Sequence, residues 1–329
     1  MADSEVVKAI LARGKITADD VLDLRHRVFL KGVVTPDNAA MVFALNDRLE
    51  QSADPSWPPF FAEVLTDYLV LQADPRGYIS DANADWLIAR IGRAGHVETA
   101  GELELLVKVL ERAQSSPVKL VTFALEQVKS GVIRCQGYVG ACHQNELGVV
   151  DKTEVELVRR ILYAYGGDGN VSITRQEAGI LFDINDATDE AKNDPAWADL
   201  FVKALANFLL ATSGYQVPTR EEALRREAWL DEPAAGVGAF MGEMMAGSLN
   251  AIWQAVKHGT IDGEPRHKSE SSPAAAEPLA SADDARWLAE RIGRDHVKRA
   301  DEVALINFLK DHQAFLHPQF AAIRDCMAA

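Results

Sequence analysis

Apolar residues recur along most of the chain at the spacing of an amphipathic α-helix. In residues 102–110 and again in 155–162, they fall at positions i, i+3, i+4 and i+7 or close to it, which places them on one helical face. Convincing alternation of apolar and polar residues, the mark of a half-buried strand, is absent. The pattern therefore predicts an all-α fold.

A short pattern marks the predicted helix starts: Val or Ile, then Ser, Thr or Asp, then an acidic or polar first turn. The Ser, Thr or Asp oxygen accepts from a free backbone N–H at a helix start. A carboxylate three residues later accepts a hydrogen bond from the backbone N–H of the capping residue and completes a capping box. Capping boxes are predicted at Thr17/Asp20, Asp151/Glu154 and Thr174/Glu177. The preceding Val or Ile is expected to anchor the first turn or to form a short bridge with a neighbouring turn.

Two sequence blocks occur twice, in the same order. Residues 45–61 read LNDRLEQSADPSWPPFF, and residues 184–201 read INDATDEAKNDPAWADLF. The second block reads ADWLIARIGR at 84–93 and ARWLAERIGR at 285–294. Because both blocks recur in order, we interpret them as an internal duplication.

The duplication divides the chain into two tandem, homologous multi-helix units of ordinary domain size. We place the first unit at 1–135, a Gly-rich and polar junction at 136–147, and the second unit at 148–329. The second unit carries an insertion at about 230–281. Within it, 258–280 is rich in Pro, Ser, Glu and Ala without apolar periodicity, which predicts a flexible tether.

Residues that recur in both units are expected to serve the fold rather than a site. The tryptophans of the two blocks lie beside apolar residues and are predicted to pack in the core. The pair Asn185-Asp186 repeats Asn46-Asp47. We predict that it ends a helix, because Asn tolerates the left-handed conformation found there.

The insertion also contains an apolar segment. Residues 234–256 have the length of a membrane span and carry a single charge, Glu243. Their Gly, Ser, Asn and Gln content argues against a membrane span. An amphipathic helix is favoured instead, because one helical face can hold Phe240, Met244, Ile252, Trp253 and Val256. The Met-rich part of this segment begins at Phe240 and ends at Val256. Because Met side chains adapt to varied surfaces, we expect this part to engage a protein partner or the other unit.

Composition narrows the function further. The formal net charge of −15 argues against sequence-independent nucleic-acid binding, which requires clustered Lys and Arg. The three cysteines show no paired spacing, which favours a reducing, cytoplasmic location. HExxH, GxSxG and Walker motifs are absent from the sequence. We therefore predict no enzyme, with a site assembled between the two units as the remaining catalytic alternative.

The loop from Gly166 to Glu177 is the one segment with candidate metal chemistry. It offers alternating oxygen donors and a late carboxylate, the arrangement that calcium prefers. These candidate ligands are Asp168, Asn170, Ser172, Thr174 and Glu177. The alternative is turn chemistry, in which Glu177 only closes the capping box on Thr174. The equivalent loop of the first unit has Lys31 opposite Asn170, so we expect no cation there.

The helix–loop–helix context and the Asp-x-Asn-x-Ser-Ile-Thr-x-x-Glu order resemble an EF-hand. The loop departs from that family in one of two ways: counted back from Glu177 it begins at Gly166 instead of Asp, and counted from Asp168 it is two residues short. The short Gly-x-Ile-Ser/Thr turns also resemble the TerB group of bacterial tellurite-resistance proteins. This resemblance implies a helical, metal-associated accessory or sensor protein. The alternative is a metal-independent helical interaction scaffold.

Overall fold

The computed structural model confirms an all-α fold. Its helices are joined by turns, and the described residues contain no strand, only two isolated parallel bridges. The structure describes residues 2–29, 32–49, 52–92, 95–142, 148–164, 173–212, 282–292 and 299–311. None of the helices in these ranges is both long and apolar enough to cross a membrane.

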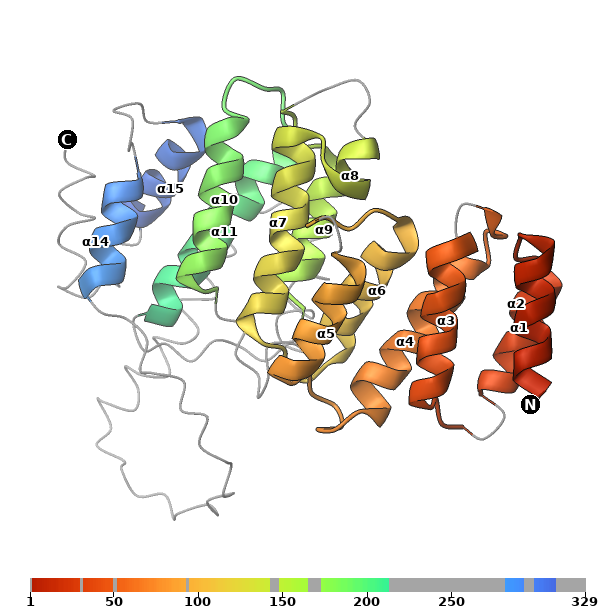
Figure 1. Cartoon of the computed structure of the whole chain (residues 1–329). Helices are drawn as coiled ribbons and strands as arrows, with labels where there is room; N and C mark the ends of the chain where they lie inside the picture. The colour runs from red at the N-terminus through yellow and green to blue at the C-terminus, as the bar shows by residue number, and fades with distance from the viewer. Residues whose placement is uncertain are drawn as a thin grey trace, which may run out of the picture. The chain divides into compact units, whose positions relative to one another are not determined.

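The chain forms two compact units, residues 1–200 and 201–329. Figure 1 shows the helices of the first unit, with α1 and α2 at the right and α10 farther to the left. They are α1 (Ala2–Arg13), α2 (Ala18–Val28), α3 (Pro36–Leu49), α4 (Trp57–Thr66), the π-helix η2 (Asp67–Gln72), α5 (Asp81–Ile91), α6 (Ala100–Arg112), α7 (Val118–Arg134), α8 (Gly137–Cys142), α9 (Lys152–Leu162) and α10 (Arg175–Ala187). Helix α11 (Pro195–Thr212) spans the division, and α14 (Ala282–Arg291) and α15 (Ala300–Asp311) belong to the second unit.

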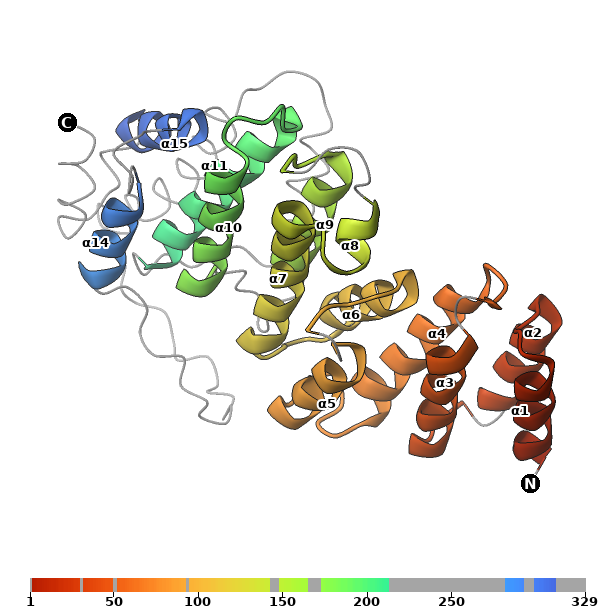
Figure 2. The same cartoon turned by 45° about the horizontal axis from the view of Figure 1, so that its top comes forward.

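The helices of the first unit fall into groups of three. The first group is α2, α3 and α4, the second is α5, α6 and α7, and the third begins with α9 and α10. The last helix of each group packs on the middle helix of the next, α4 on α6 and α7 on α10. Helix α1 packs on α3 in the same way. In Figure 2, α7 lies between α6 and α10, both of which it contacts.

Backbone bonds tie the first and last helix of a group together. The turn before α2 pairs with the turn before α4, because Asp54 N–H donates to the Ile16 carbonyl at 2.9 Å and Ile16 N–H donates to Ser52 at 3.3 Å. In the second group, Ile79 N–H donates to the Ser115 carbonyl at 3.0 Å. The short bridge predicted for these Ile residues is therefore present in the first two groups.

The third group has the same tie with one replacement. Asp194 N–H donates to the Val150 carbonyl at 2.8 Å, as Asp54 does to Ile16. The Val150 N–H, however, donates to the side-chain Oδ1 of Asn193 at 2.9 Å. A side-chain amide thus takes the place of a backbone carbonyl, and Val150 remains fully buried.

Trp57 and Trp197 lie in the core, as the sequence predicts, with 0% of each side chain exposed. A buried indole N–H requires an acceptor. Trp57 Nε1 donates to Asn46 Oδ1 at 2.9 Å, and Trp197 Nε1 donates to Asn185 Oδ1 at 3.1 Å. Asn185 lies in the last turn of α10, which ends at Ala187, so the predicted helix ending is there. The reason predicted for it is wrong: Asn185 is not in the left-handed conformation, and its buried amide oxygen serves instead as the acceptor of the indole.

The second recurring tryptophan is half-buried and packs against aromatic rings. Trp86 makes edge contacts with Phe43 at 5.3 Å and Tyr68 at 6.2 Å between centroids. The Arg90 guanidinium lies 5.6 Å from the Phe43 and Trp86 centroids. In the second unit, Trp287 makes an edge contact with Phe208 at 5.7 Å.

Several predictions about the linking segments meet the structure only in part. The predicted junction at 136–147 contains α8, and its remaining residues 143–147 lie outside the described residues. The predicted insertion at 230–281 lies outside the described residues. The predicted tether at 258–280 and the Met-rich segment at 240–256 are parts of it. The division of the compact units within α11 reflects helix packing, whereas the predicted boundaries rest on repeated sequence, so those boundaries stay predictions.

Candidate functional site: the loop before α10

The structure describes two of the five predicted metal ligands. Thr174 and Glu177 are described, whereas Asp168, Asn170 and Ser172 lie outside the described residues. The described part of the loop therefore begins at Ile173, directly before α10. What Thr174 and Glu177 do there decides how much of the predicted donor set is free for a cation.

Thr174 and Glu177 form a complete capping box at the start of α10. Thr174 has extended backbone geometry, and its Oγ1 accepts from the Glu177 N–H at 3.3 Å. Glu177 Oε2 accepts from the Thr174 N–H at 2.7 Å and from the Thr174 hydroxyl at 3.0 Å. One carboxylate oxygen therefore already satisfies two donors at the helix start.

Glu177 is also buried, with 7% of its surface exposed. Burial raises the pKa of its carboxyl, because removal from water disfavours the charged form, and the two bonds from Thr174 oppose this only partly. Among the described residues no cationic side chain pairs with it. A desolvated, capped carboxylate fits the turn chemistry alternative better than the position of a calcium ligand, which would face the loop.

The same box occurs at the other predicted positions. Asp151 N–H donates to Glu154 Oε2 at 3.0 Å at the start of α9, where Glu154 is buried. Before α15, at a position that was not predicted, only the carboxylate half of the box occurs: Arg299 N–H donates to the buried Glu302 at 3.0 Å. The predicted boxes at Thr17/Asp20, Asp151/Glu154 and Thr174/Glu177 are all confirmed. The Glu177 geometry is thus one copy of a recurring helix start.

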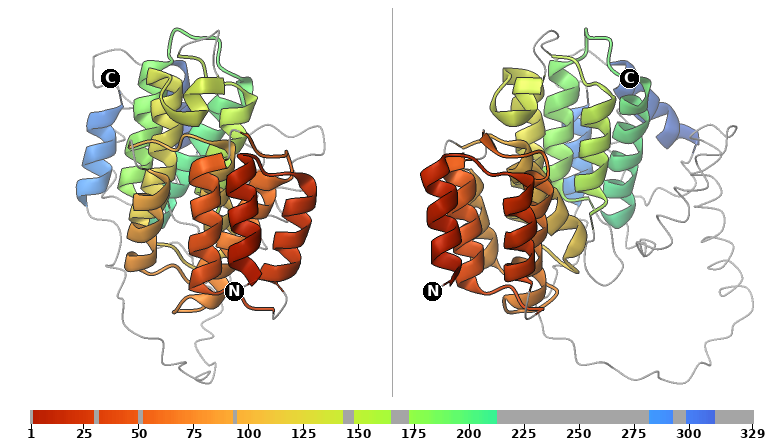
Figure 3. Two further views of the ribbon diagram at one scale, coloured as in Figure 1. Left: turned by 45° about the vertical axis from the view of Figure 1, so that its right-hand side comes forward. Right: turned by 90° about the vertical axis from the view of Figure 1, so that its right-hand side faces the viewer.

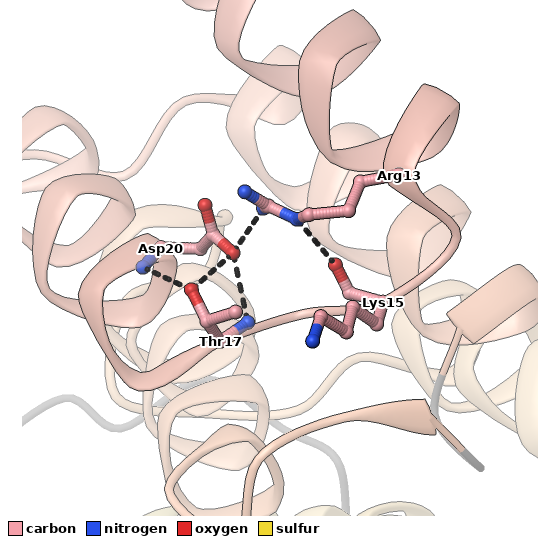
Figure 4. A network of polar contacts seen from close by, with 4 residues as sticks. All are labelled: Arg13, Lys15, Thr17 and Asp20. Atoms are coloured by element: carbon pink, nitrogen blue, oxygen red, sulfur yellow. Dashed lines mark hydrogen bonds and ion pairs between the residues drawn. The ribbon is translucent and has the colours of Figure 1, made fainter.

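The box at α2 differs by having a cation (Figure 4). Asp20 Oδ2 accepts from the Thr17 N–H at 2.8 Å and hydroxyl at 2.6 Å, and it also pairs with the Arg13 guanidinium. Arg13 Nε reaches the Lys15 carbonyl at 3.5 Å. Burial raises the pKa of Asp20, but the bonds from Thr17 and the charge of Arg13 outweigh it, so its pKa lies below the usual value. The pKa of the capping carboxyl is therefore lowered at α2 and raised at α10.

Across the described ranges, no three His, Cys, Asp or Glu side chains come together as a group able to hold a metal ion. This finding covers neither the loop residues 165–172 nor the insertion. The calcium hypothesis consequently rests on Asp168, Asn170 and Ser172 alone, with Glu177 already engaged.

Sequence reasoning missed the ion pairs that join neighbouring groups. Arg160 on α9 makes two bonds to the Glu111 carboxylate on α6, at 2.8 and 3.1 Å. Lys129 on α7 reaches Asp183 on α10 at 3.4 Å. These pairs are long-range in sequence, and no local spacing could have indicated them.

Comparison with known proteins does not assign the chain to a family. The chain matches no family model, and neither curated proteins nor solved structures yield a similar one.

Proposed function

We propose that the chain is a metal-independent helical scaffold for protein–protein contacts, built from the two homologous sequence units at 1–135 and 148–329. The observation that carries this proposal is the engagement of the buried Glu177 in a capping box that recurs at the starts of α2 and α9. Because the box accounts for the late carboxylate, Glu177 needs no cation as a partner.

The duplication within this proposal is supported by matched contacts as well as by sequence. Each half has a buried Trp whose indole donates to an Asn in the preceding helix. Each half also has an edge contact between an aromatic residue and the second recurring Trp, Tyr68 with Trp86 and Phe208 with Trp287. Unrelated helical segments would not be expected to share both contacts in the same order.

The scaffold role is supported by how the groups pack. Helices of one group contact those of the next through α4 and α6, α6 and α9, and α7 and α10. Stacked helical groups of this kind present extended surfaces to partners. The net charge of −15 favours a partner with a basic surface, because complementary charge speeds encounter. Cytoplasmic location and kinship with the TerB group belong to the proposal as well.

Calcium binding by a degenerate EF-hand-like loop remains the second proposal. It is favoured by the alternation of Asp168, Asn170 and Ser172 immediately before the cap. In that case the protein is an accessory or sensor that acts through protein contacts, and the Met-rich segment at 240–256 engages the partner.

Calorimetric titration of the full chain with calcium, and separately with magnesium, distinguishes the two proposals. The scaffold predicts no binding heat in the parent protein. Heat that is present in the parent and lost in the Asp168→Ala, Glu177→Ala double variant would overturn it. An Asp189→Ala variant is the matched control, since Asp189 is an acidic residue outside the loop.

A further inference from the structure

Helix α15 corresponds to α6 in the two sequence units. The recurring block aligns α14 with α5, and α6 and α15 are the helices that follow. Glu102 and Glu302 lie at the same position near the starts of these helices, and both are buried. Each accepts from a backbone N–H just before its helix, at 3.2 and 3.0 Å. Residues of α15 are therefore matched to residues of α6 numbered 200 lower.

One face of α6 is covered by α9, the first helix of the third group. Glu104 and Glu111 lie on this face, and Arg160 of α9 reaches them at 3.7 Å and 2.8 Å. Val107 lies on the same face between the two acids, because residues three and four apart share one side of a helix. Its side chain is only 1% exposed. Helix α9 thus shields this side of α6 from water.

The corresponding face of α15 is exposed. Ala304 and Asn307 take the positions of Glu104 and Val107, and both are exposed. Val303, the neighbour of Ala304, is 39% exposed. Helix α15 is the last helix that the structure describes. Among the described residues, this face therefore lacks the cover that α9 gives to α6.

The duplication identifies the helix that matches this face. Helix α2 corresponds to α9, because both have 11 residues and a complete capping box. The next helix in each case carries the Asn that accepts from a buried indole, Asn46 or Asn185. In α2, His26 takes the position of Arg160 and is exposed, and Leu22, one turn earlier, is 64% exposed. The counterpart of α9 therefore has an exposed side with an apolar residue on it.

Helix α1 extends the same surface. It packs on α3 as α7 packs on α10, and Figure 3 shows this N-terminal end of the chain with α1 and α2 in the darkest red. Helix α7 contacts α5 and α6 as well as α9 and α10. By the same correspondence, α1 of an incoming copy lies against α14 and α15. Two helices from each copy then form the interface instead of a single helix pair.

We propose that α1 and α2 of one copy of this chain stack on α14 and α15 of a second copy, as α7 and α9 stack on α5 and α6. The partner is a second copy because the structure already contains this contact once, and the chain carries the exposed counterparts of both its sides. The inference rests on the homologous sequence units of the proposed function. Because the contact joins two different surfaces, it is heterologous, and assembly continues head to tail.

Sedimentation velocity of the full chain over a range of concentrations, with a metal chelator present, tests the stacking. The parent protein is expected to form oligomers that lengthen as concentration rises. Leu22→Asp places a charge on the α2 side and Val303→Asp on the α15 side, and each variant alone should assemble at least tenfold more weakly. Val118→Asp is the matched control, since Val118 is an exposed apolar residue on α7, and it should assemble like the parent.

A mixture of the two interface variants tests the head-to-tail geometry. The Leu22→Asp chain keeps its α15 surface and the Val303→Asp chain keeps its α2 surface, so the mixture should form dimers that cannot grow. Melting curves of dilute samples establish that each variant is folded, and Leu22→Ser or Val303→Ser replaces one that is not.

Three results would overturn the proposal: a parent that stays monomeric, interface variants that assemble like the parent, or a mixture that forms no dimer. A monomeric parent that Val303→Asp destabilises would show that the same chain covers the α15 face. Because the chelator removes metal ions throughout, these outcomes are independent of the calcium titration. Failure of the stacking is therefore distinguishable from failure of the metal-independent scaffold.

Discussion

At the scale of single residues, two capping boxes with the same bonding pattern shift the pKa of their carboxyl groups in opposite directions. Glu177 is buried without a cationic partner among the described residues, and its pKa is raised. Asp20 shares its carboxylate between Thr17 and Arg13, and its pKa is lowered. The two residues should therefore change stability with pH in opposite directions.

For Glu177, the folded protein binds the proton more tightly than the unfolded chain. Its contribution to stability is complete below the unfolded pKa and is lost as pH rises through the folded pKa. Glu177→Gln keeps an acceptor for Thr174 without the charge, so relative to the parent it should gain stability between about pH 4 and pH 7. Glu177→Ala should cost about 1 kcal/mol through loss of the cap. Urea denaturation at both pH values measures this, and a Gln variant that loses stability relative to the parent as pH rises would contradict it.

For Asp20, the unfolded chain binds the proton more tightly. Its stabilisation is present above the unfolded pKa and is lost as pH falls through the folded pKa. Asp20→Asn should be less stable than the parent at neutral pH by roughly 0.5–1 kcal/mol, because the Arg13 pair is partly exposed. The difference should disappear in acid. A deficit that persists unchanged in acid denaturation would show that charge is not its cause.

The sequence predicted these caps because each depends on residues three apart. It could not predict their burial or pKa shifts, because those depend on which helices cover the cap. Asn46 and Asn185 illustrate the same limit. Their role as acceptors for indoles 11 and 12 residues away arises only when two helices pack, so local turn chemistry gave a wrong interpretation.

At the scale of the helices, the Asn–Trp pairs join consecutive elements of each half. Asn46→Ala and Asn185→Ala should each leave a buried indole N–H without its acceptor, at a cost of about 1–3 kcal/mol. A double change, Asn46→Leu with Trp57→Phe, removes donor and acceptor together and should cost less than the sum of its parts. Chemical denaturation provides the values. Additive costs would mean that the bond does not couple α3 to α4.

The α7–α8 turn depends on a glycine for a different reason. A Cβ at Gly140 would lie 2.1 Å from the Cys135 backbone carbon, so any side chain forces α8 away from α7. Gly140→Ala should destabilise the protein by about 1–3 kcal/mol, as overpacking does. Ala141→Ser, at an exposed neighbouring position, should change stability little. Equal melting temperatures for the two variants would contradict the close approach.

At the scale of the whole chain, the sequence blocks, the capping boxes and the backbone bonds between turns all recur. This recurrence indicates that one helical arrangement is repeated along the chain. The sequence revealed the all-α class and the order of the recurring blocks, because amphipathic periodicity and cap spacing are local. The groups of three helices became visible only through packing, as α4 on α6 and α7 on α10. Asp168, Asn170 and Ser172, on which the calcium hypothesis depends, lie outside the described residues.

The central claim is that Glu177 caps a helix and does not hold a cation. The most direct test compares melting temperatures of the parent and Glu177→Gln with and without millimolar calcium, because a ligand that binds only the folded state raises the melting temperature. The account predicts that calcium shifts neither protein. A rise in the parent that is absent in Glu177→Gln would contradict it.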